Sequence, residues 1–215
     1  MNQVDPAVVA ERAATVRARL DAAGGAGVRI VAVTKTFGPS AVDAAVAAGL
    51  DDVGENYAQE AAAKLTEITT TPTVHFIGRL QRNKVRLLAP HVDVWQTVDR
   101  PELATEIAKR APGAKVMIQV DISGEENKGG CGPDTTEDLV MHATDTGLEV
   151  IGLMGVALLA EPQAARPGFS VLRRLVDRLD LDECSMGMSA DLEIAVDEGA
   201  TMVRIGRDLF GERLG

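Results

Sequence analysis

Short apolar segments alternate with helical segments along this chain, and the alternation constrains the fold more than any other feature. The first apolar segment, VRIVAVT at 28–34, is typical of a buried strand because it is short and rich in β-branched residues. A helix is expected before it over 5–24, where Asp5 and Pro6 form a favourable N-terminus and two glycines a favourable end.

This strand-helix alternation recurs until eight strands are counted, each followed by a helix or helical turn. Strands that alternate with helices imply a parallel sheet. A doubly wound open sheet is the competing interpretation, but we favour a single (β/α)8 TIM barrel over residues 1–215 with an extra N-terminal helix. After 28–34, strands are expected near 52–54, 73–77, 93–98, 115–121, 149–154, 183–186 and 201–205. Helices are expected near 39–48, 56–68, 80–89, 101–110, 135–146, 163–179 and 189–198, and a surface loop over 157–169.

Composition excludes several classes of protein. A net charge of -10 disfavours a nucleic-acid-binding protein, although it leaves room for a local anion pocket. The apolar runs are far shorter than a membrane span, and the N-terminus does not resemble a signal peptide. Cys131 and Cys184 lack zinc-ligand spacing and indicate reduced thiols, so we expect a cytoplasmic protein without a metal site.

Polar residues that follow the apolar runs are the candidates for a site, because barrel enzymes build theirs at the C-terminal strand ends. Lys35 ends the first run. Burial of an ammonium group is costly and lowers the pKa of a lysine, which makes the amine nucleophilic, as Schiff-base chemistry requires. The alternative is that Lys35 extends to the barrel rim and stays solvated.

The last two strands also end in candidate residues. Ser189 either caps the helix after the seventh strand or contributes to a phosphate site. Gly206 follows the eighth strand, where the missing side chain lets a ligand approach its amide closely. Arg204 lies inside or at the mouth of the barrel and needs a ligand or an acidic partner, such as Glu55 or Asp121.

Two other segments have several interpretations. RLQRNKVRLL at 79–88 is either a solvated basic helix, an anion site or a docking surface. SGEENKGGCGP at 123–133 is a charged, glycine-rich loop in which Asn127 and Lys128 are candidates for covering the pocket. The histidines are interpreted as structural or exposed, because none is spaced for a metal site or a catalytic triad; they are His75, His91 and His142.

Nearly the whole chain resembles the pyridoxal 5′-phosphate (PLP) homeostasis protein family. The resemblance implies a (β/α)8 barrel similar to the N-terminal domain of bacterial alanine racemases. The segments that match, in chain order, are VAVTKTF around Lys35, GENYAQE (54–60), HFIGRLQRNK (75–84), VDISGEENKGG (120–130), GLMGV (152–156) and SMGMSADLEIAVDEGATMVRIGRDLFG (185–211).

The resemblance also implies that PLP forms an internal aldimine, a Schiff base, with Lys35. No catalytic residue is implied. The other cofactor-binding positions that it implies are Ser189, Gly206 and Arg207 at the phosphate, Arg204 facing the pyridine nitrogen, and Asn56 and Met154 lining the cofactor.

The function implied is that of a non-catalytic PLP carrier in vitamin B6 homeostasis, expected to be a monomer with PLP-dependent apoenzymes or amino acids as partners. An arginine at the pyridine nitrogen disfavours protonation there and makes the ring a weaker electron sink. The alternative is an amino-acid racemase of low activity, which needs a second acid/base group. Racemases of this fold obtain that group from a second domain, and Tyr57 is the single tyrosine here. A third interpretation is a barrel that binds another phosphorylated metabolite.

Overall fold

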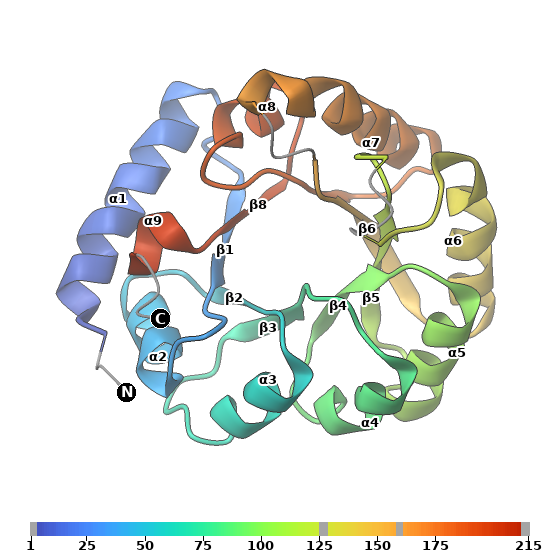
Figure 1. The fold of residues 1–215 in the computed structure, drawn as a ribbon, viewed down its shortest axis with the longest axis horizontal. Coiled ribbons are helices and arrows are strands. Elements are labelled where there is room, and N and C mark those ends of the chain that lie inside the picture. Colours follow the sequence, from blue (N-terminus) through green and yellow to red (C-terminus); the bar gives the residue numbers. More distant parts are fainter. Residues whose placement is uncertain (1–3, 125–128, 158–160, 212–215) are drawn as a thin grey trace.

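The computed structural model describes residues 4–124, 129–157 and 161–211. Within these residues, eight parallel strands pair in chain order, and the first strand also pairs with the last. The sheet therefore closes on itself, and a ring of helices surrounds it (Figure 1). The predicted (β/α)8 barrel is confirmed, and the open-sheet alternative is wrong.

Each strand starts and ends within one residue of the segment expected from the sequence. They are β1 (Arg29–Val33), β2 (Asp52–Glu55), β3 (Thr73–Phe76), β4 (Val94–Val98), β5 (Lys115–Val120), β6 (Glu149–Gly155), β7 (Glu183–Ser185) and β8 (Met202–Ile205). The helices are α1 (Pro6–Ala22), α2 (Pro39–Ala47), α3 (Ala58–Lys64), α4 (Val85–Leu88), α5 (Pro101–Arg110), α6 (Thr136–Asp145), α7 (Arg166–Arg178), α8 (Leu192–Asp197) and α9 (Arg207–Phe210). None of these described helices is long and apolar enough to cross a membrane.

The extra helix α1 begins and ends as its sequence predicts. The side chain of Asp5 accepts a hydrogen bond from the amide of Ala7, and Gly24 follows the helix with a φ of 84°. Its buried face packs against α2, α8 and α9, so the first and last helices lie side by side (Figure 1). This contact joins the beginning of the chain to the loops that follow β7 and β8.

The surface loop expected over 157–169 is only partly correct. Pro162–Ala165 forms a 3₁₀ helix that continues directly into α7, and the side chain of Phe169 is fully buried. Proline is compatible with the first turn of a helix, where its missing N–H would have no helical partner. Pro162 and Pro167 therefore stand in the first turns of the 3₁₀ helix and of α7.

The inside of the barrel differs from the layer between the strands and the helices. That outer layer is a continuous apolar core. The barrel interior holds a small apolar cluster together with buried polar or charged side chains, among them a hydrogen-bonded polar group. The interior residues are Val31, Val94, Met117, Met154 and Met202, and the polar group is His75, Gln96, Ser185 and Arg204.

Candidate functional site

Lys35 lies two residues beyond β1, at the C-terminal end of the barrel, and its side chain is half-buried. The next residue, Thr36, has a φ of 70°, in the left-handed region that β-branched residues rarely adopt. Its amide donates a hydrogen bond to the carboxylate of Glu60, which fixes this turn. Strained backbone of this kind occurs at functional sites when the surroundings hold it in place. The turn therefore sets the direction in which Lys35 leaves the strand.

A buried cluster of charged side chains contacts the same turn. The Nζ atom of Lys64 lies 2.8 Å from Oε1 of Glu55 and 2.8 Å from Oε1 of Glu60. It also donates to the carbonyl oxygen of Thr34, next to Lys35 in the chain. Burial raises the pKa of Glu55, although the charge of Lys64 opposes that effect. The sequence analysis missed this cluster, whose only local signal was a lysine among the alanines of α3.

Arg204 points into the barrel from β8, and only 5% of the residue is exposed. Its Nη1 atom donates to Oγ of Ser185 at 2.7 Å, and Nη2 donates to the carbonyl oxygen of Gly155 at 2.7 Å. Burial lowers its pKa to about 10, against the opposing charge of Asp191. Arg204 is thus a buried cation held by neutral acceptors.

The acidic partners expected for Arg204 are wrong. Glu55 pairs with Lys64 instead. The carboxylate of Asp121 accepts hydrogen bonds from the amides of Ser123 and Gly124, which fixes its own loop. Sequence spacing could not distinguish these partners, because the strand register decides which side chains face each other.

The loop after β7 also corrects one expectation. Asp191 is the N-cap residue of α8, and its side chain accepts a hydrogen bond from the amide of Met188. Ser189, half-buried, precedes the cap, so the interpretation of Ser189 as the cap is wrong. The carbonyl oxygen of Ser189 accepts a hydrogen bond from Arg19, which attaches this loop to α1.

Two glycines at the C-terminal end of the barrel differ in how much room the fold leaves for a Cβ atom. A Cβ atom added to Gly78 would lie 2.0 Å from the backbone oxygen of Asn56, so packing alone requires glycine there. A Cβ atom added to Gly206 would meet only Val33, at 3.4 Å, an ordinary contact distance. Gly206 also has a φ of -118°, which any residue adopts. The fold therefore tolerates a small side chain at Gly206 and does not itself require glycine there.

The residues implied by the resemblance lie on one arc of the barrel. Lys35 and Gly206 follow the paired strands β1 and β8, and Met154 lies on β6, paired with Ser185 of β7. Asn56 follows β2, and its Oδ1 atom is buried without a hydrogen-bond partner among the described residues. The arc also includes Ser189, half-buried, and Arg207, exposed at the start of α9.

Other sequence candidates lie apart from this arc. The 79–88 segment follows β3 as a 3₁₀ helix and α4, with Arg79, Arg82 and Arg86 exposed. Asn127 and Lys128 lie outside the described residues. In the part of the chain that the structure describes, no three histidine, cysteine or acidic side chains come together to hold a metal ion.

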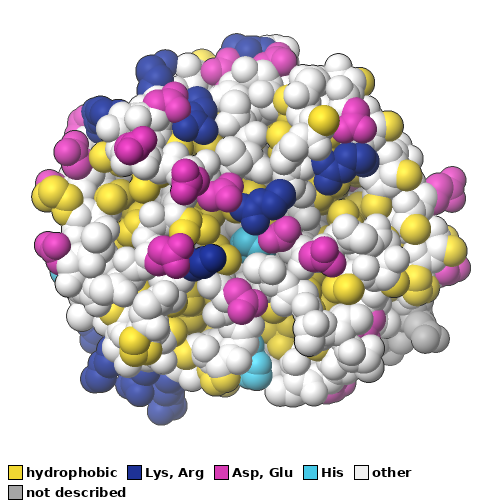
Figure 2. Space-filling model, turned by 180° about the vertical axis from the view of Figure 1, so that it is seen from behind, with side chains coloured by type: hydrophobic (Ala, Val, Ile, Leu, Met, Phe, Trp, Pro, Cys, Tyr) yellow, Lys and Arg dark blue, Asp and Glu magenta, His cyan; other side chains and the backbone are white. Residues whose placement is uncertain are grey.

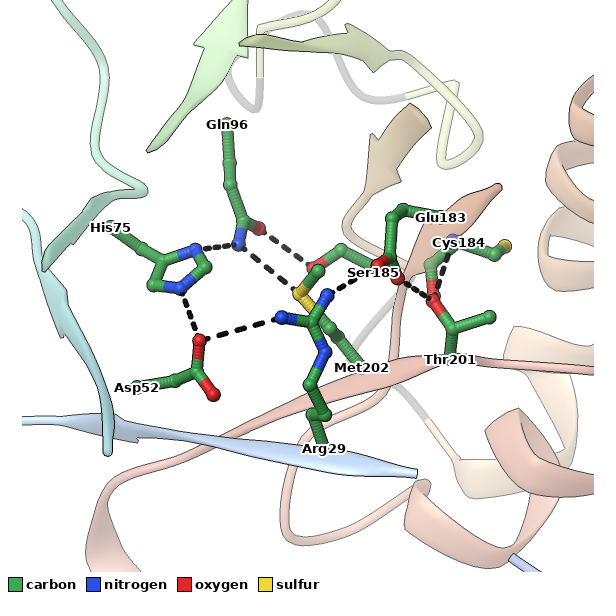
Figure 3. A network of polar contacts seen from close by, with 9 residues as sticks. All are labelled: Arg29, Asp52, His75, Gln96, Glu183, Cys184, Ser185, Thr201 and Met202. Carbon is green, nitrogen blue, oxygen red and sulfur yellow. Dashed lines mark hydrogen bonds and ion pairs between the residues drawn. The ribbon is translucent and has the colours of Figure 1, made fainter. Parts of the chain in front are cut away.

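Sequence reasoning also missed a polar network inside the barrel. The Nε2 atom of His75 lies 2.7 Å from Oδ1 of Asp52, and its Nδ1 atom lies 2.8 Å from Nε2 of Gln96 (Figure 3). His75 is therefore structural, as predicted, but with an acidic partner that the sequence spacing did not reveal. This contact depends on the register of the neighbouring strands β2 and β3, in which Gly54 is paired with His75.

Together, the arc offers an amine, a buried guanidinium and backbone amides near the C-terminal ends of neighbouring strands. An amine in such a place can condense with an aldehyde, and open amides can bind an anion. The geometry therefore suits a ligand that has both a carbonyl group and an anionic group.

Comparison with known proteins concerns the chain as a whole. The family model of the alanine racemase N-terminal domain matches residues 4–214. A Pseudomonas aeruginosa protein named pyridoxal phosphate homeostasis protein is 42% identical over 95% of this chain and 96% of its own. The structure of PipY from Synechococcus elongatus without PLP is 34% identical, with a TM-score of 0.85 over 94% of this chain and all of that one. A second PipY structure, with PLP bound, has a TM-score of 0.82 at 32% identity over the same shares of both chains.

Proposed function

This chain belongs to the family of pyridoxal phosphate homeostasis proteins, built on the alanine racemase N-terminal domain, and we propose that it binds PLP covalently through Lys35. The observation on which the proposal depends is the half-buried lysine at the end of β1, directly beside the β8 end that bears Gly206. We further propose that residues 1–215 act as one PLP-binding domain.

The residues present fit this cofactor. Beside Gly206 the fold leaves space that it does not need, which suits a phosphate group against the backbone amide. Ser189 and Arg207 supply a hydroxyl and a cation for the same group. The buried Oδ1 atom of Asn56 lacks a partner among the described residues, as expected for a side chain that faces a ligand.

Lys35 forms the covalent bond in this proposal. When bound, PLP would supply an aldehyde carbon with which the side-chain amine of Lys35 would condense, with the aldehyde oxygen lost as water. Thr36 and the cluster around Lys64 hold the lysine in position for this condensation. Bound PLP supplies an electron-withdrawing ring, whose strength depends on the group beside its nitrogen.

Arg204 determines that strength if it faces the pyridine nitrogen. A guanidinium donates hydrogen bonds and repels a proton, so the nitrogen stays unprotonated and carbanions at the cofactor are poorly stabilised. Tyr57, the tyrosine that might replace a second acid/base group, is 50% exposed at the start of α3. We therefore favour a carrier that takes part in PLP homeostasis without turnover, acting as a cytoplasmic monomer that exchanges PLP with apoenzymes or amino acids.

Two measurements test binding and carriage separately. Titration of the purified protein with PLP should produce the absorbance band of a protonated Schiff base at one equivalent. A panel of amino acids in deuterium oxide should then exchange their α-protons no faster than with free PLP. Exchange well above that rate would favour the racemase alternative, whereas an unchanged PLP spectrum would favour a barrel for another phosphorylated ligand.

Gly206→Ala tests the phosphate contact. Because the fold accommodates the new methyl group, the thermal stability should stay close to that of the wild type. The methyl group would fill the space beside the amide, and loss of a hydrogen bond to a charged group costs about 1.5–3 kcal/mol. The Kd for PLP should therefore rise about tenfold or more.

Gly27→Ala is the matched control, because an added Cβ atom there has nothing within 4 Å. It should leave both the stability and the Kd unchanged. An unchanged Kd in Gly206→Ala would remove this residue from the phosphate site.

A further inference from the structure

A continuous line of hydrogen bonds crosses the inside of the barrel and begins at Arg204. Nη1 of Arg204 donates to Oγ of Ser185 at 2.7 Å, and this hydroxyl donates to Oε1 of Gln96 at 2.7 Å. Nε2 of Gln96 lies 2.8 Å from Nδ1 of His75, and Nε2 of His75 lies 2.7 Å from Oδ1 of Asp52. The line thus joins the C-terminal end of the strands to the first residue of β2 at the opposite end.

The interior members of this line are sealed from solvent. Ser185, Gln96 and His75 are each 0% exposed. A buried polar group that loses its partner costs free energy, so each member has one arrangement that satisfies it. The line consequently behaves as one unit rather than as independent pairs.

Both ends of the line fix the direction of every hydrogen bond in it. A guanidinium can only donate hydrogen bonds, so the hydroxyl oxygen of Ser185 accepts from Arg204. The hydroxyl hydrogen of Ser185 is then left to donate a hydrogen bond to Gln96. The amide oxygen of Gln96 is then occupied, so its NH₂ group faces His75, whose Nδ1 atom accepts. Nε2 of His75 therefore bears the proton, which it donates to Asp52. All of these bonds donate away from Arg204 and towards the carboxylate.

The outer end of the line is anchored on the N-terminal face of the barrel. Nη1 of Arg29 lies 3.6 Å from Oδ1 of Asp52, and Arg29 also pairs with Glu183 (Figure 3). Burial acts to raise the pKa of Asp52, but the hydrogen bond and electrostatic attraction from His75, together with the charge of Arg29, outweigh it and lower the pKa. Asp52 is therefore a stable carboxylate acceptor.

This face also contains an open cavity of about 730 Å³, lined by Arg29, Lys115, Glu149 and Glu183 among others. Figure 2 shows acidic and basic side chains gathered around the middle of the face. The far end of the line thus lies among hydrated charges, whereas Arg204 lies among neutral acceptors. The hydrogen bonds therefore run in one direction, from the buried guanidinium of Arg204 to the carboxylate of Asp52.

We propose that Ser185, Gln96 and His75 are positioning residues that hold the Arg204 guanidinium in one orientation against the PLP ring nitrogen, with Asp52 as their fixed outer acceptor. This inference rests on the proposed function, since it assumes that PLP occupies the site with its ring nitrogen at Arg204. Side chains far from the cofactor then affect how readily the ring nitrogen is protonated. Disruption anywhere along the line should change the electronic state of the bound ring.

The test follows the ring nitrogen itself. PLP labelled with nitrogen-15 is bound to the full-length protein, and its resonance is recorded for the wild type, Ser185→Ala, Gln96→Leu and Gln96→Glu. Ser185→Ala and Gln96→Leu should both shift the resonance towards that of a protonated pyridine. In Gln96→Glu the resonance should stay at its wild-type position, because a carboxylate accepts hydrogen bonds from Ser185 and also from a doubly protonated His75.

Thr136→Val is the control for loss of a buried hydroxyl. Thr136 is 0% exposed and donates to the carbonyl oxygen of Gly132 at 3.0 Å, outside the barrel interior. Its loss should lower the thermal stability without moving the resonance. If Gln96→Leu does not fold, Ser185→Ala decides the result, because it removes a single oxygen atom.

The outcomes separate the two claims. If the wild-type protein gives the resonance of bound PLP and neither Ser185→Ala nor Gln96→Leu changes it, the positioning role is overturned. The proposed function then still stands. A wild-type protein that gives only the resonance of free PLP overturns the proposed function and this inference together.

Discussion

Replacement of Lys35 by alanine should abolish the Schiff-base absorbance of the protein with PLP, because no other amine is proposed to reach the cofactor aldehyde. PLP should still bind, more weakly, through the phosphate contacts at Ser189 and Gly206. The fold should remain intact, because Lys35 is only half-buried and lies beyond the end of β1. The measurement is an absorbance titration with PLP, paired with circular dichroism of the same samples.

Lys115→Ala is the control for this experiment. Lys115 starts β5 at the opposite end of the barrel and is exposed, so its loss should leave the absorbance band unchanged. An undiminished band in Lys35→Ala would contradict the assignment of the Schiff base to this residue.

Lys64→Met should cause the largest loss of stability among the variants considered. Lys64 is 5% exposed, and its ammonium lies 2.8 Å from the fully buried carboxylate of Glu55. Removal of one partner of a buried ion pair leaves the other charge without compensation and costs about 3–5 kcal/mol. Urea unfolding near neutral pH should therefore show a loss of this size in the free energy of unfolding.

The loss should depend on pH in a defined direction. The pKa of Glu55 is raised in the folded protein, mainly by burial. A carboxyl group of this kind contributes stability below its unfolded pKa and loses that contribution as the pH rises through its folded pKa. The deficit of Lys64→Met should therefore be smaller in mildly acidic solution, where Glu55 takes up a proton, than at neutral pH.

Two further variants test this explanation. Glu55→Gln combined with Lys64→Met should recover part of the lost stability, because the uncompensated charge is gone. Arg110→Ala, which removes an exposed pair with Glu106 on α5, should have a much smaller effect. A deficit in Lys64→Met that does not change with pH would mean that lost packing, rather than the charge of Glu55, is responsible.

The fold could be predicted because its signals are local. The VRIVAVT segment predicts β1 by its β-branched residues, and Asp5 with Pro6 predicts the start of α1. Closure of the barrel is different, because it depends on the pairing of β1 with β8 across the whole chain. The helix expected near 163–179 is present, but the surface loop expected over 157–169 overlaps its first turns, because proline is common both in loops and in first turns.

The site could be predicted only in part, for the same reason. Strand ends place Lys35 and Gly206 at the C-terminal end of the barrel without any knowledge of pairing. The partners of Arg204 depend on register, and so does the contact between His75 and Asp52. The left-handed conformation of Thr36 has no signal in its sequence, because the surrounding contacts impose it.

The covalent attachment of PLP to Lys35 is tested most directly by reductive trapping. The protein is mixed with PLP, reduced with borohydride and digested, and mass spectrometry then locates the phosphopyridoxyl group. We predict one modified peptide with the label on Lys35. A label on another lysine, such as Lys64 or Lys84, or no label above that of a PLP-treated unfolded control, would contradict the assignment.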